Sequence, residues 1–338
     1  MKNDKVKNII TIGASAGGLE AISRLVTTFQ AEMDAAIFIV IHLSEYSKAD
    51  VIKNILQKRT ALLCVVPVDQ QEIENSTIYL APSDHHLLID IGQMRVTKGA
   101  AENHWRPSID TLFRSAATAY NACVTGIILT GLLDDGTSGM NAIKQCGGRC
   151  MVQSPEEAAF PDMPNSVLRA VTVDYNVAIA EMGSILNDLF TKAPCEEHNV
   201  PVEIKLEADI ARRLTTEIED IAKLGSFTPL TCPDCGGVMV KIDHDAVPRY
   251  RCYTGHTFTE KFLEVEQLRR IEESVWVSIR MMEERKNLLI NLEAEANLRR
   301  GMVNEKRNLP AEEMQLHINA LRATLQHLDR NDTSFTNK

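Results

Sequence analysis

The chain has 338 residues, 44% of them apolar, which is enough for two or three domains with at least one sizeable core. Its formal net charge is -10 and it has no long basic run, which argues against nucleic acid or an anionic membrane surface as partner. We find no signal sequence and no apolar stretch of about 18 residues, so we expect a cytoplasmic protein without membrane insertion.

The first half of the chain alternates short apolar runs with amphipathic segments. The runs lack polar alternation, like strands that are buried on both faces of a parallel sheet. They cover residues 8–13, 36–42, 62–68, 125–131 and 150–154. Segments with helical periodicity lie between them, near residues 17–29, 48–58, 107–119, 137–146 and 164–171. The pattern predicts an α/β domain with a mostly parallel, doubly wound sheet, which we place at residues 1–191.

One stretch of this domain departs from the pattern. Residues 77–82, 86–91 and 94–99 alternate apolar and polar side chains, with Gly92-Gln93 as the turn between the last two. This period of two is typical of a local antiparallel hairpin or meander. We therefore predict one antiparallel insertion in the α/β domain.

The second half of the chain has three parts. A polar linker and one amphipathic helix over 203–223 occupy residues 192–229, and a compact Cys/His module follows at 230–258. Residues 259–338 are predicted to be a helical tail whose last ten residues are disordered. An apolar stripe in the tail fits two structures equally well: a helix packed on its own domain, or one used for self-association or partner docking. The stripe consists of Leu268, Ile271, Val275, Ile279, Met282, Leu289 and Leu292.

A glycine-rich turn, GASAGG at residues 13–18, connects the first predicted strand to the first helix. It places Ser15 at the carboxyl edge of the sheet, where free amides of the helix N-terminus can stabilise a negative charge. Ser15 is therefore a candidate nucleophile, although the turn alone favours a serine that merely caps the helix. Dinucleotide binding fits less well, because the spacing is G-x-x-x-G-G and no acidic residue ends the second strand.

Two further polar groups end predicted buried strands. His42 closes the second strand, and Asp134-Asp135 follows the strand over 125–131. The carboxyl ends of the strands in an open α/β sheet share one crevice, so Ser15, His42 and an aspartate can converge there. Acyl transfer requires this convergence, with His42 as general base and an aspartate that fixes the tautomer and charge of the imidazole.

Six sequence motifs follow one another over roughly residues 8–190: GASAGGLEAI, IVIHLS, IYLAPSDHHL, HWRPSIDTLF, ILTGLLDDGTSGM and DMPNSV. With this set the chain resembles the catalytic domain of the chemotaxis protein-glutamate methylesterases. The resemblance implies hydrolysis of γ-glutamyl methyl esters on the cytoplasmic helices of chemoreceptors, with release of methanol. It also raises glutamine deamidation as a second activity.

The resemblance assigns roles to individual residues. Ser15 becomes the nucleophile, His42 the base and Asp135 the acid. Asp135 is preferred to Asp134 because Thr-Gly before the two aspartates and Gly after them fix the register. No cofactor is expected for this chemistry. The RPS-x-D motif resembles a segment that lines the family's cleft, so substrate binding is predicted for Arg106, Ser108 and Asp110. A cluster that caps the following helix is an equally good interpretation of this motif.

Three features depart from the family pattern. Ala16 stands where threonine is usual, which removes a hydroxyl near the oxyanion. Leu132-Leu133 replaces Met-Gly in a turn whose backbone amide helps to hold the oxyanion. No receiver domain precedes the strand at Asn8, so we do not expect control by an attached receiver. The alternative function is therefore a methylesterase-like binding or regulatory module with weakened chemistry, but retention of all three triad residues favours an enzyme.

The Cys/His module contains the pairs Cys232/Cys235 and Cys252/His256, with sixteen residues between the pairs. Four such ligands complete a tetrahedral Zn²⁺ site without an open position for water, so we predict a structural metal. His244 is a rival fourth ligand, and ordinary free cysteines are the alternative. We expect zinc to hold the module together while hydrolysis resides in the separate α/β domain. The other cysteines are predicted to be small buried hydrophobes: Cys64, Cys123, Cys146, Cys150 and Cys195.

Overall fold

The computed structural model describes residues 6–42, 47–192, 195, 198–213, 217–300 and 309–332. The chain divides into two compact units, Met1–Phe262 and Leu263–Lys338, which are described separately below. Among the described residues, no helix is both long enough and apolar enough to cross a membrane.

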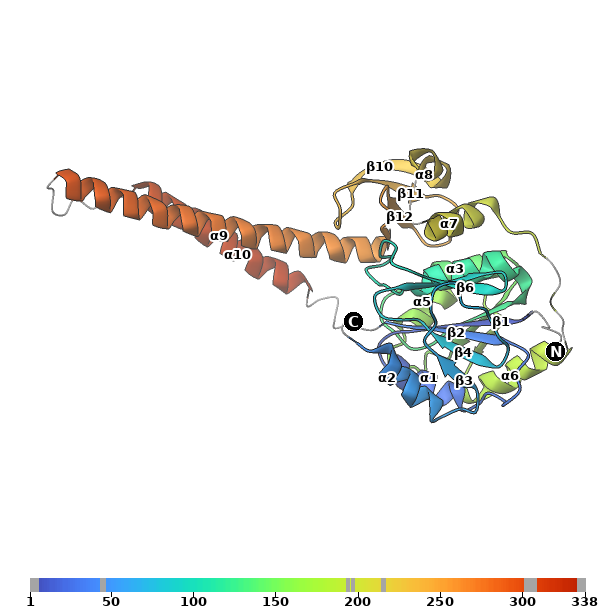
Figure 1. Ribbon diagram of the computed structural model, residues 1–338. Helices are drawn as coiled ribbons and strands as arrows, with labels where there is room; N and C mark the ends of the chain where they lie inside the picture. The colour runs from blue at the N-terminus through green and yellow to red at the C-terminus, as the bar shows by residue number, and fades with distance from the viewer. Residues whose placement is uncertain are drawn as a thin grey trace. The chain divides into compact units, whose positions relative to one another are not determined.

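A seven-stranded sheet forms the centre of the first unit (Figure 1). All neighbouring strands are parallel, and their order is β3-β4-β2-β1-β7-β8-β9. The predicted parallel sheet is thus confirmed. Its strands are β1 (Ile9–Ala14), β2 (Ala36–Ile41), β3 (Leu63–Val65), β4 (Thr77–Leu80), β7 (Val124–Ile128), β8 (Arg149–Gln153) and β9 (Tyr175–Val177).

Helices cover both faces of this sheet, as Figure 1 shows. One face packs on α1 (Gly18–Val26), α2 (Ala49–Gln57) and α6 (Ile179–Lys192). The other packs on α3 (Ile109–Tyr120), α4 (Thr137–Gln145) and α5 (Asp162–Ala170). Alternate residues of the central strands face the two cores: Ile37 and Ile39 of β2 point to one, Phe38 and Val40 to the other. Burial on both faces explains why these strands carry uninterrupted apolar runs.

The antiparallel insertion is smaller than its sequence pattern indicates. β5 (His86–Asp90) and β6 (Gln93–Thr97) form the predicted hairpin. Residues 77–82, however, were predicted to belong to the same meander, and this is wrong: β4 lies in the parallel sheet between β3 and β2. The alternation of TIYL is misleading because its polar members are buried too. The Tyr79 hydroxyl accepts a hydrogen bond from the Glu74 backbone N–H at 3.0 Å.

Two helices and a second sheet complete the first unit. The single helix predicted over 203–223 is wrong, because Glu217 is extended and separates α7 (Val202–Arg213) from α8 (Ile218–Leu224). The second sheet, which we call the ribbon, is antiparallel and four-stranded, in the order β10-β11-β12-β13. It begins before the predicted module start at residue 230. Its strands are β10 (Gly225–Thr231), β11 (Val238–Ile242), β12 (Arg249–Cys252) and β13 (Thr257–Thr259).

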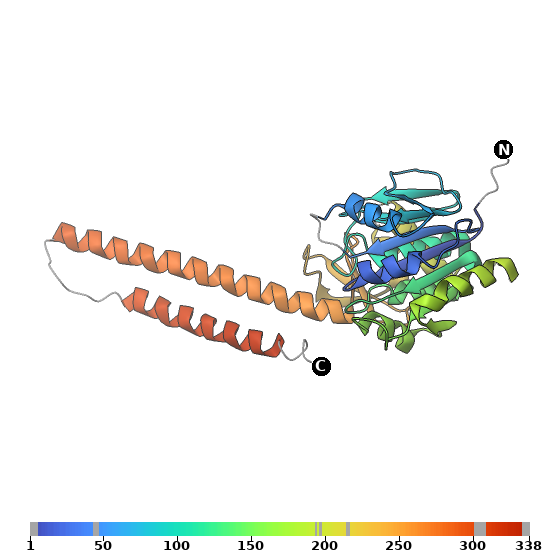
Figure 2. The ribbon, with the colours of Figure 1, turned by 90° about the horizontal axis from the view of Figure 1, so that it is seen from below.

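The second unit is an antiparallel helical hairpin of α9 (Glu260–Arg300) and α10 (Leu309–Asp332), seen side by side in Figure 2. Ile279 of the predicted stripe is buried against Ile318, whereas Ile271 and Leu292 remain about half exposed. Lys286 Nζ donates to Gln315 Oε1 at 2.7 Å across the hairpin. Helix α10 includes residues 329–332 of the segment predicted to be disordered, and residues 333–338 lie outside the described residues.

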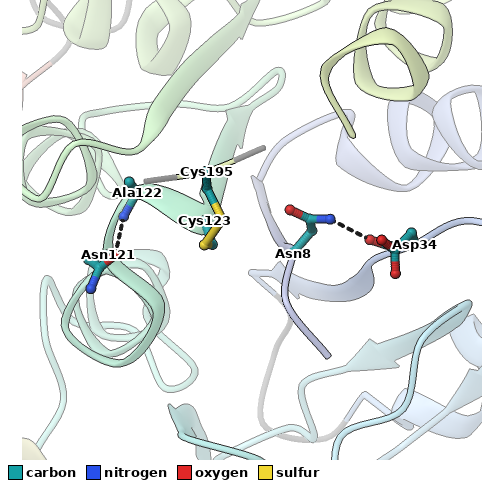
Figure 3. The surroundings of a disulfide bond; sticks show 6 residues. All are labelled: Asn8, Asp34, Asn121, Ala122, Cys123 and Cys195. Atoms are coloured by element: carbon teal, nitrogen blue, oxygen red, sulfur yellow. Dashed lines mark hydrogen bonds between the residues drawn. A yellow bond between two sulfur atoms is a disulfide. The ribbon is translucent and has the colours of Figure 1, made fainter. Parts of the chain in front are cut away.

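A disulfide joins Cys123 and Cys195 (Figure 3). The prediction that these two were isolated buried hydrophobes is therefore wrong, and their separation of 72 residues explains why no spacing motif revealed them. Cys123 directly precedes β7, so the bond ties the chain beyond α6 to the amino end of that strand. The remaining three, Cys64, Cys146 and Cys150, are free and buried as predicted.

Candidate functional site

Ser15 lies where the strand order of the parallel sheet reverses. β1 has β2 on one side and β7 on the other, and Ser15 follows its last residue. The Ser15 backbone N–H donates to the Thr130 carbonyl at 3.0 Å, which joins the ends of β1 and β7. Gly131 lies against the serine so closely that a Cβ there would be 2.9 Å from Ser15 Cβ. The turn thus holds Ser15 at the carboxyl edge, as the sequence predicts.

His42 connects this serine to a carboxylate. Its Nε2 lies 2.8 Å from Asp135 Oδ2, and its Nδ1 lies 3.3 Å from Ser15 Oγ. A carboxylate can only accept, so Nε2 carries the proton and Nδ1 is free to accept from the serine hydroxyl. The imidazole also stacks on Trp105, with ring centroids 4.2 Å apart and planes inclined by 8°. Tautomer and ring plane are both fixed by these contacts.

Asp135 is buried at the N-terminus of α3. Its Oδ2 accepts from the Ile109 backbone N–H at 2.8 Å, and its Oδ1 accepts from Ser108 Oγ at 3.1 Å and from Asn103 Nδ2 at 2.9 Å. Burial by itself raises the pKa of this carboxyl, but the hydrogen bonds from His42, Asn103 and Ile109 outweigh it and hold the pKa at about 2. Asp135 is therefore ionised at neutral pH, in the field of a helix N-terminus.

The neighbouring acids behave differently. Burial and the nearby Asp135 charge raise the pKa of Asp110 well above its ordinary value. Asp110 Oδ1 accepts from the Gly139 backbone N–H at 2.7 Å. Asp134 accepts from Thr259 Oγ1 at 2.9 Å instead of facing His42. The geometry therefore places Asp135, and not Asp134, beside the imidazole.

The three residues predicted to bind substrate occupy different environments. Arg106 is partly exposed and forms an ion pair with Asp84 at 2.6 Å. Ser108 and Asp110 are buried next to Asp135 and do not reach the surface. The capping interpretation also needs correction, because the Ser108 side chain makes no hydrogen bond to the backbone of α3. The carboxylate of Asp135 accepts from the first amide of that helix instead.

Two of the three departures from the family pattern, Leu132-Leu133 and Ala16, lie close to the site. Leu133 has φ of 64°, the left-handed conformation that glycine adopts more readily. Leu132 is 48% exposed. Within the described part of the chain, the backbone N–H groups of Ala16 and Gly17 have no hydrogen-bond partner. They stand at the N-terminus of α1, next to Ser15.

Sequence reasoning missed two residues that contact the triad. Trp105 stacks on His42, and Asn103 donates to Asp135. Both lie in an irregular loop before α3, where no periodicity or spacing predicts a position. The only signal in the sequence is that NHW directly precedes the RPS-x-D motif.

The ribbon brings all four predicted metal ligands together. The ligand atoms of Cys232, Cys235, Cys252 and His256 lie within 4.8 Å of one another. Cys235 Sγ and Cys252 Sγ are 3.7 Å apart, close to the separation of roughly 3.8 Å for two thiolates on a tetrahedral Zn²⁺. His244, the rival ligand, lies near Glu207 instead, with Nε2 3.9 Å from Oε1. The residues present therefore fit a zinc ion.

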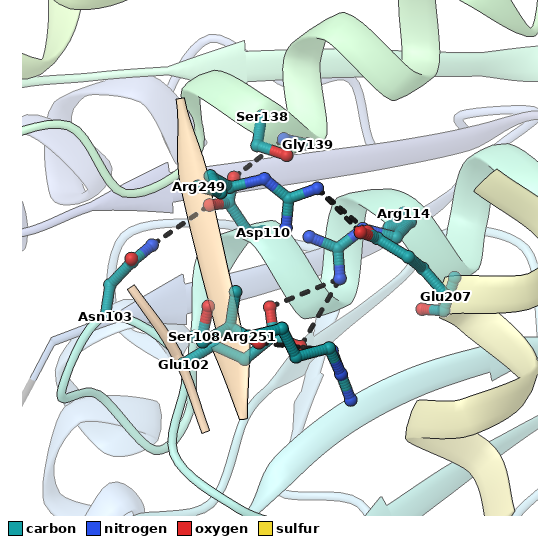
Figure 4. A network of polar contacts seen from close by, with 12 residues as sticks. Glu102, Asn103, Ser108, Asp110, Arg114, Ser138, Gly139, Glu207, Arg249 and Arg251 are labelled. Atoms are coloured by element: carbon teal, nitrogen blue, oxygen red, sulfur yellow. Dashed lines mark hydrogen bonds and ion pairs between the residues drawn. The ribbon is translucent and has the colours of Figure 1, made fainter. Parts of the chain in front are cut away.

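Buried ion pairs dock the ribbon onto the α/β domain (Figure 4). Arg249 of β12 donates to both oxygens of Glu207 in α7 at 2.8 and 2.9 Å, and Glu207 also pairs with Arg114 of α3 at 2.7 Å. Glu102 pairs with Arg114 at 3.2 Å and with Arg251 at 3.4 Å. The ribbon and the α/β domain lie in the same compact unit and share a charged, buried interface.

A hydroxyl, an imidazole and an ionised carboxylate are hydrogen-bonded in sequence at the carboxyl edge of a parallel sheet. This is the arrangement of an α/β serine hydrolase. A family model described as CheB methylesterase matches residues 10–186. The chain belongs to the CheB methylesterase family.

Known relatives agree with this assignment. A Leptospira interrogans protein, provisionally named protein-glutamate methylesterase/protein-glutamine glutaminase, is 34% identical over 177 residues, 52% of this chain and 91% of that protein. A Methanosarcina mazei protein named protein-glutamate methylesterase/protein-glutamine glutaminase 2 is 31% identical over 185 residues, 52% of this chain. The chain spans about half, 50%, of the length of that relative. The crystal structure of the Thermotoga maritima CheB methylesterase catalytic domain matches 54% of this chain and 98% of its own length, with a TM-score of 0.52 and 26% identity.

Proposed function

We propose that the chain hydrolyses γ-glutamyl methyl esters and releases methanol, with Ser15 as nucleophile, His42 as general base and Asp135 as the acid of the triad. The observation that carries this proposal is the continuous hydrogen-bonded path from Ser15 Oγ through His42 to Asp135. The distance from Ser15 Oγ to His42 Nδ1, 3.3 Å, is longer than the 2.8 Å from His42 Nε2 to Asp135 Oδ2. Such a longer contact is common in a site without substrate.

The geometry supports two chemical steps. Ser15 Oγ attacks the ester carbonyl while its proton passes to His42 Nδ1, and the amides of Ala16 and Gly17 are available to the oxyanion. His42 then donates this proton to the departing methanol, which leaves a glutamyl ester on Ser15. In the second step His42 deprotonates a water molecule that cleaves this ester and restores the serine. Asp135 stays ionised throughout and stabilises the imidazolium.

The substrate class follows from the family and not from the site alone. We propose the cytoplasmic helices of chemoreceptors as substrate, with glutamine deamidation as a second reaction at the same serine. The named relatives from Leptospira and Methanosarcina carry both activities in their names. A receptor substrate of this kind places the chain in the cytoplasm.

The competing function is a binding or regulatory module whose chemistry is weakened by Ala16 and Leu132-Leu133. The backbone favours the enzyme, because Leu133 adopts a left-handed conformation that is readily open to the glycine usual in the family. A module without chemistry also has no need for an ionised Asp135 held by His42, Asn103 and Ile109.

We further propose a structural Zn²⁺ on Cys232, Cys235, Cys252 and His256. The four ligand atoms converge, and four protein ligands leave no position for a reactive water. Such a metal contributes folding free energy to the ribbon.

For the helical hairpin we retain self-association or partner docking as its role, because α9 exposes apolar side chains such as Trp276 and Met281.

Mass spectrometry of methylated receptor fragments tests the main proposal. Incubation with the chain is expected to convert methyl esters to carboxylates, and Ser15→Ala is expected to abolish this conversion without loss of fold. Unchanged fragments after incubation with the wild-type chain, in the presence of zinc, would overturn the assignment as an esterase.

A further inference from the structure

The loop of residues 100–105, here called the clamp loop, lies between the ribbon and the triad. Its ribbon side pairs with β13: the Asn103 backbone N–H donates to the Thr257 carbonyl at 2.7 Å, and the Thr257 N–H donates to Ala101 at 3.4 Å. Its other side carries Trp105, which stacks on His42. The loop therefore contacts both β13 and the triad.

The conformation of the clamp loop requires external support. Asn103 and His104 both have positive φ, 51° and 67°. This region is sterically unfavourable for residues other than glycine, although asparagine tolerates it best. Such a conformation persists only where surrounding contacts hold it. The contacts with β13 provide this support.

The side chain of Asn103 is buried and uses its hydrogen-bonding groups in both directions. Its Oδ1 accepts from the Thr259 backbone N–H at 2.9 Å. Its Nδ2 donates to Asp135 Oδ1 at 2.9 Å and to Asp110 Oδ2 at 3.1 Å. Figure 4 shows Asn103 with its amide directed toward Asp110. The amide thus connects the end of the ribbon to the ionised carboxylate of the site.

The ribbon also determines which way this amide points. A backbone N–H can only donate, so the N–H of Thr259 requires the oxygen of Asn103 on its side. The NH₂ group then necessarily faces Asp135. Without Thr259, a rotation of the amide by half a turn would present an oxygen to the carboxylate and replace attraction by repulsion.

We propose that Asn103 is a positioning residue for Asp135, and that strand β13 of the ribbon fixes its amide in the orientation that hydrolysis requires. This inference rests on the proposed esterase function. It assigns the ribbon a role in catalysis at a distance: the ribbon touches no reacting atom, but it holds the clamp loop, which holds Asp135 and His42.

The metal ligands provide a means of releasing this contact. His256 directly precedes Thr257, and the Cys252 N–H donates to the His256 carbonyl at 2.9 Å in the turn between β12 and β13. Loss of the ion frees this turn, and β13 is the strand next to it. Thr259 ends β13 and also donates its hydroxyl to Asp134 at 2.9 Å. Chelation should therefore loosen the contacts to Asn103 without altering a single residue.

The first experiment substitutes Asn103 in the full chain and follows hydrolysis of a small carboxylic methyl ester. Asn103→Ala removes one hydrogen bond to a charged group, so kcat should fall about ten- to hundredfold while KM changes less than about twofold. Asn103→Asp keeps the shape and the acceptor for Thr259 but removes the donor, and should lose as much. Both variants lose a donor that stabilises the ionised form of Asp135, so the pKa of Asp135 should rise. The acid limb of the pH profile of kcat/KM should therefore move to higher pH.

A matched control separates this role from general loss of structure. Asn75 donates to Asp34 at 2.9 Å, in a part of the unit that does not contact the triad. Asn75→Ala should therefore leave kcat and the pH profile unchanged. Wild-type kcat and an unmoved acid limb in a folded Asn103→Asp chain would overturn the proposal.

The second experiment uses fluorescence, which does not depend on activity. The chain has two tryptophans, so Trp276→Phe leaves Trp105 as the only one. The stacked His42 ring covers one face of the Trp105 indole, so acrylamide should quench its emission only weakly in the intact chain. Chelation of zinc, or Cys235→Ser, should increase this quenching and lower kcat about tenfold or more. Added Zn²⁺ should restore both in the chelated protein.

The outcomes distinguish the two proposals. A wild-type chain that hydrolyses no ester, yet shows stronger quenching of Trp105 on chelation, contradicts the esterase and leaves the ribbon contact standing. A chelated chain whose ribbon is cleaved by protease, but which keeps full kcat and the weak quenching of Trp105, contradicts the role of β13 and leaves the esterase standing.

Discussion

The carboxylate of Asp135 lies 2.8 Å from the backbone N–H of Ile109, the first residue of α3. An aspartate from the end of one strand thus caps a helix that begins 26 residues earlier in the chain. The free amide and the helix dipole both favour its negative charge. The same contact fixes where the carboxylate meets His42, so helix α3 contributes to the electrostatics of the site.

Substitution of the two buried acids should separate their roles. In Asp135→Asn the amide donates to His42 Nε2, which moves the imidazole proton to Nδ1 and removes the acceptor for Ser15. We expect kcat to fall about 10⁴-fold. Burial and the charge of Asp135 raise the pKa of Asp110, which disfavours its anion, so Asp110→Asn should change kcat less than about fivefold. Ester hydrolysis at pH 7 measures both, and a large loss in Asp110→Asn would show that Asp110 acts as an anion.

Stability at low pH should reflect the buried ion pairs between ribbon and α/β domain. Burial alone raises the pKa of Glu207, but Arg114 and Arg249 outweigh it and hold the pKa at about 2. Because this pKa lies below the unfolded value of 4.5, the stabilisation is complete above about 4.5 and is lost as the pH falls toward 2. Each such group contributes on the order of 3 kcal/mol to this pH dependence.

Urea unfolding between pH 2 and 6 measures this loss. Glu207→Gln should flatten the pH dependence while lowering stability at neutral pH, because it leaves buried arginines without a full partner. Glu203→Gln, an exposed substitution in the same helix, serves as control and should retain the wild-type slope. If the free energy of unfolding depends on pH equally in wild type and in Glu207→Gln, Glu207 is not the source of the acid sensitivity.

Leu133 offers a test of backbone strain. Leu133→Gly should leave the free energy of unfolding unchanged or raise it by up to about 1 kcal/mol, because glycine adopts the positive φ without steric cost. Hydrolysis should persist at the wild-type rate or faster. The β-branched Leu133→Val should lower stability by about 1 kcal/mol or more. Thermal unfolding compares the three, and a stabilising valine would show that the turn is not strained.

The disulfide should affect stability and not chemistry. Cys123 lies at the amino end of β7, whereas Ser15 and His42 lie at the carboxyl edge of the sheet. Reduction, or the double substitution of Cys123 and Cys195 by serine, should lower the free energy of unfolding by about 2–4 kcal/mol. The value of kcat at 25 °C should be unchanged. Unfolding curves with and without reductant, together with initial rates, decide this.

The parts of the site that lie at strand ends were accessible from sequence. Ser15 and His42 each follow an uninterrupted apolar run, and the rule that strand ends share one edge brings them together. The choice of Asp135 over Asp134 came from the family pattern, because the two neighbours are chemically identical in sequence. The four metal ligands were also accessible, since they come in two closely spaced pairs.

The remaining contacts depend on tertiary structure that no local pattern encodes. Asn103 is held by Thr257 and Thr259, more than 150 residues later in the chain, and its loop has no periodicity. The same is true of Cys123 and Cys195, 72 residues apart. The error at β4 has another cause: Thr77 and Tyr79 are polar by type but buried, so alternation of residue types did not mark a solvated face.

The pairing of Asn103 with Thr257 has a consequence for the order in which the protein matures. Ribosomes release the α/β domain first, and domains fold as they emerge. A nascent chain that ends before β13 already contains Ser15, His42 and Asp135, but nothing yet fixes the Asn103 amide. Full activity would therefore arrive only when synthesis has passed Thr259. Prematurely terminated chains would therefore be poorer esterases than chains that contain Thr259.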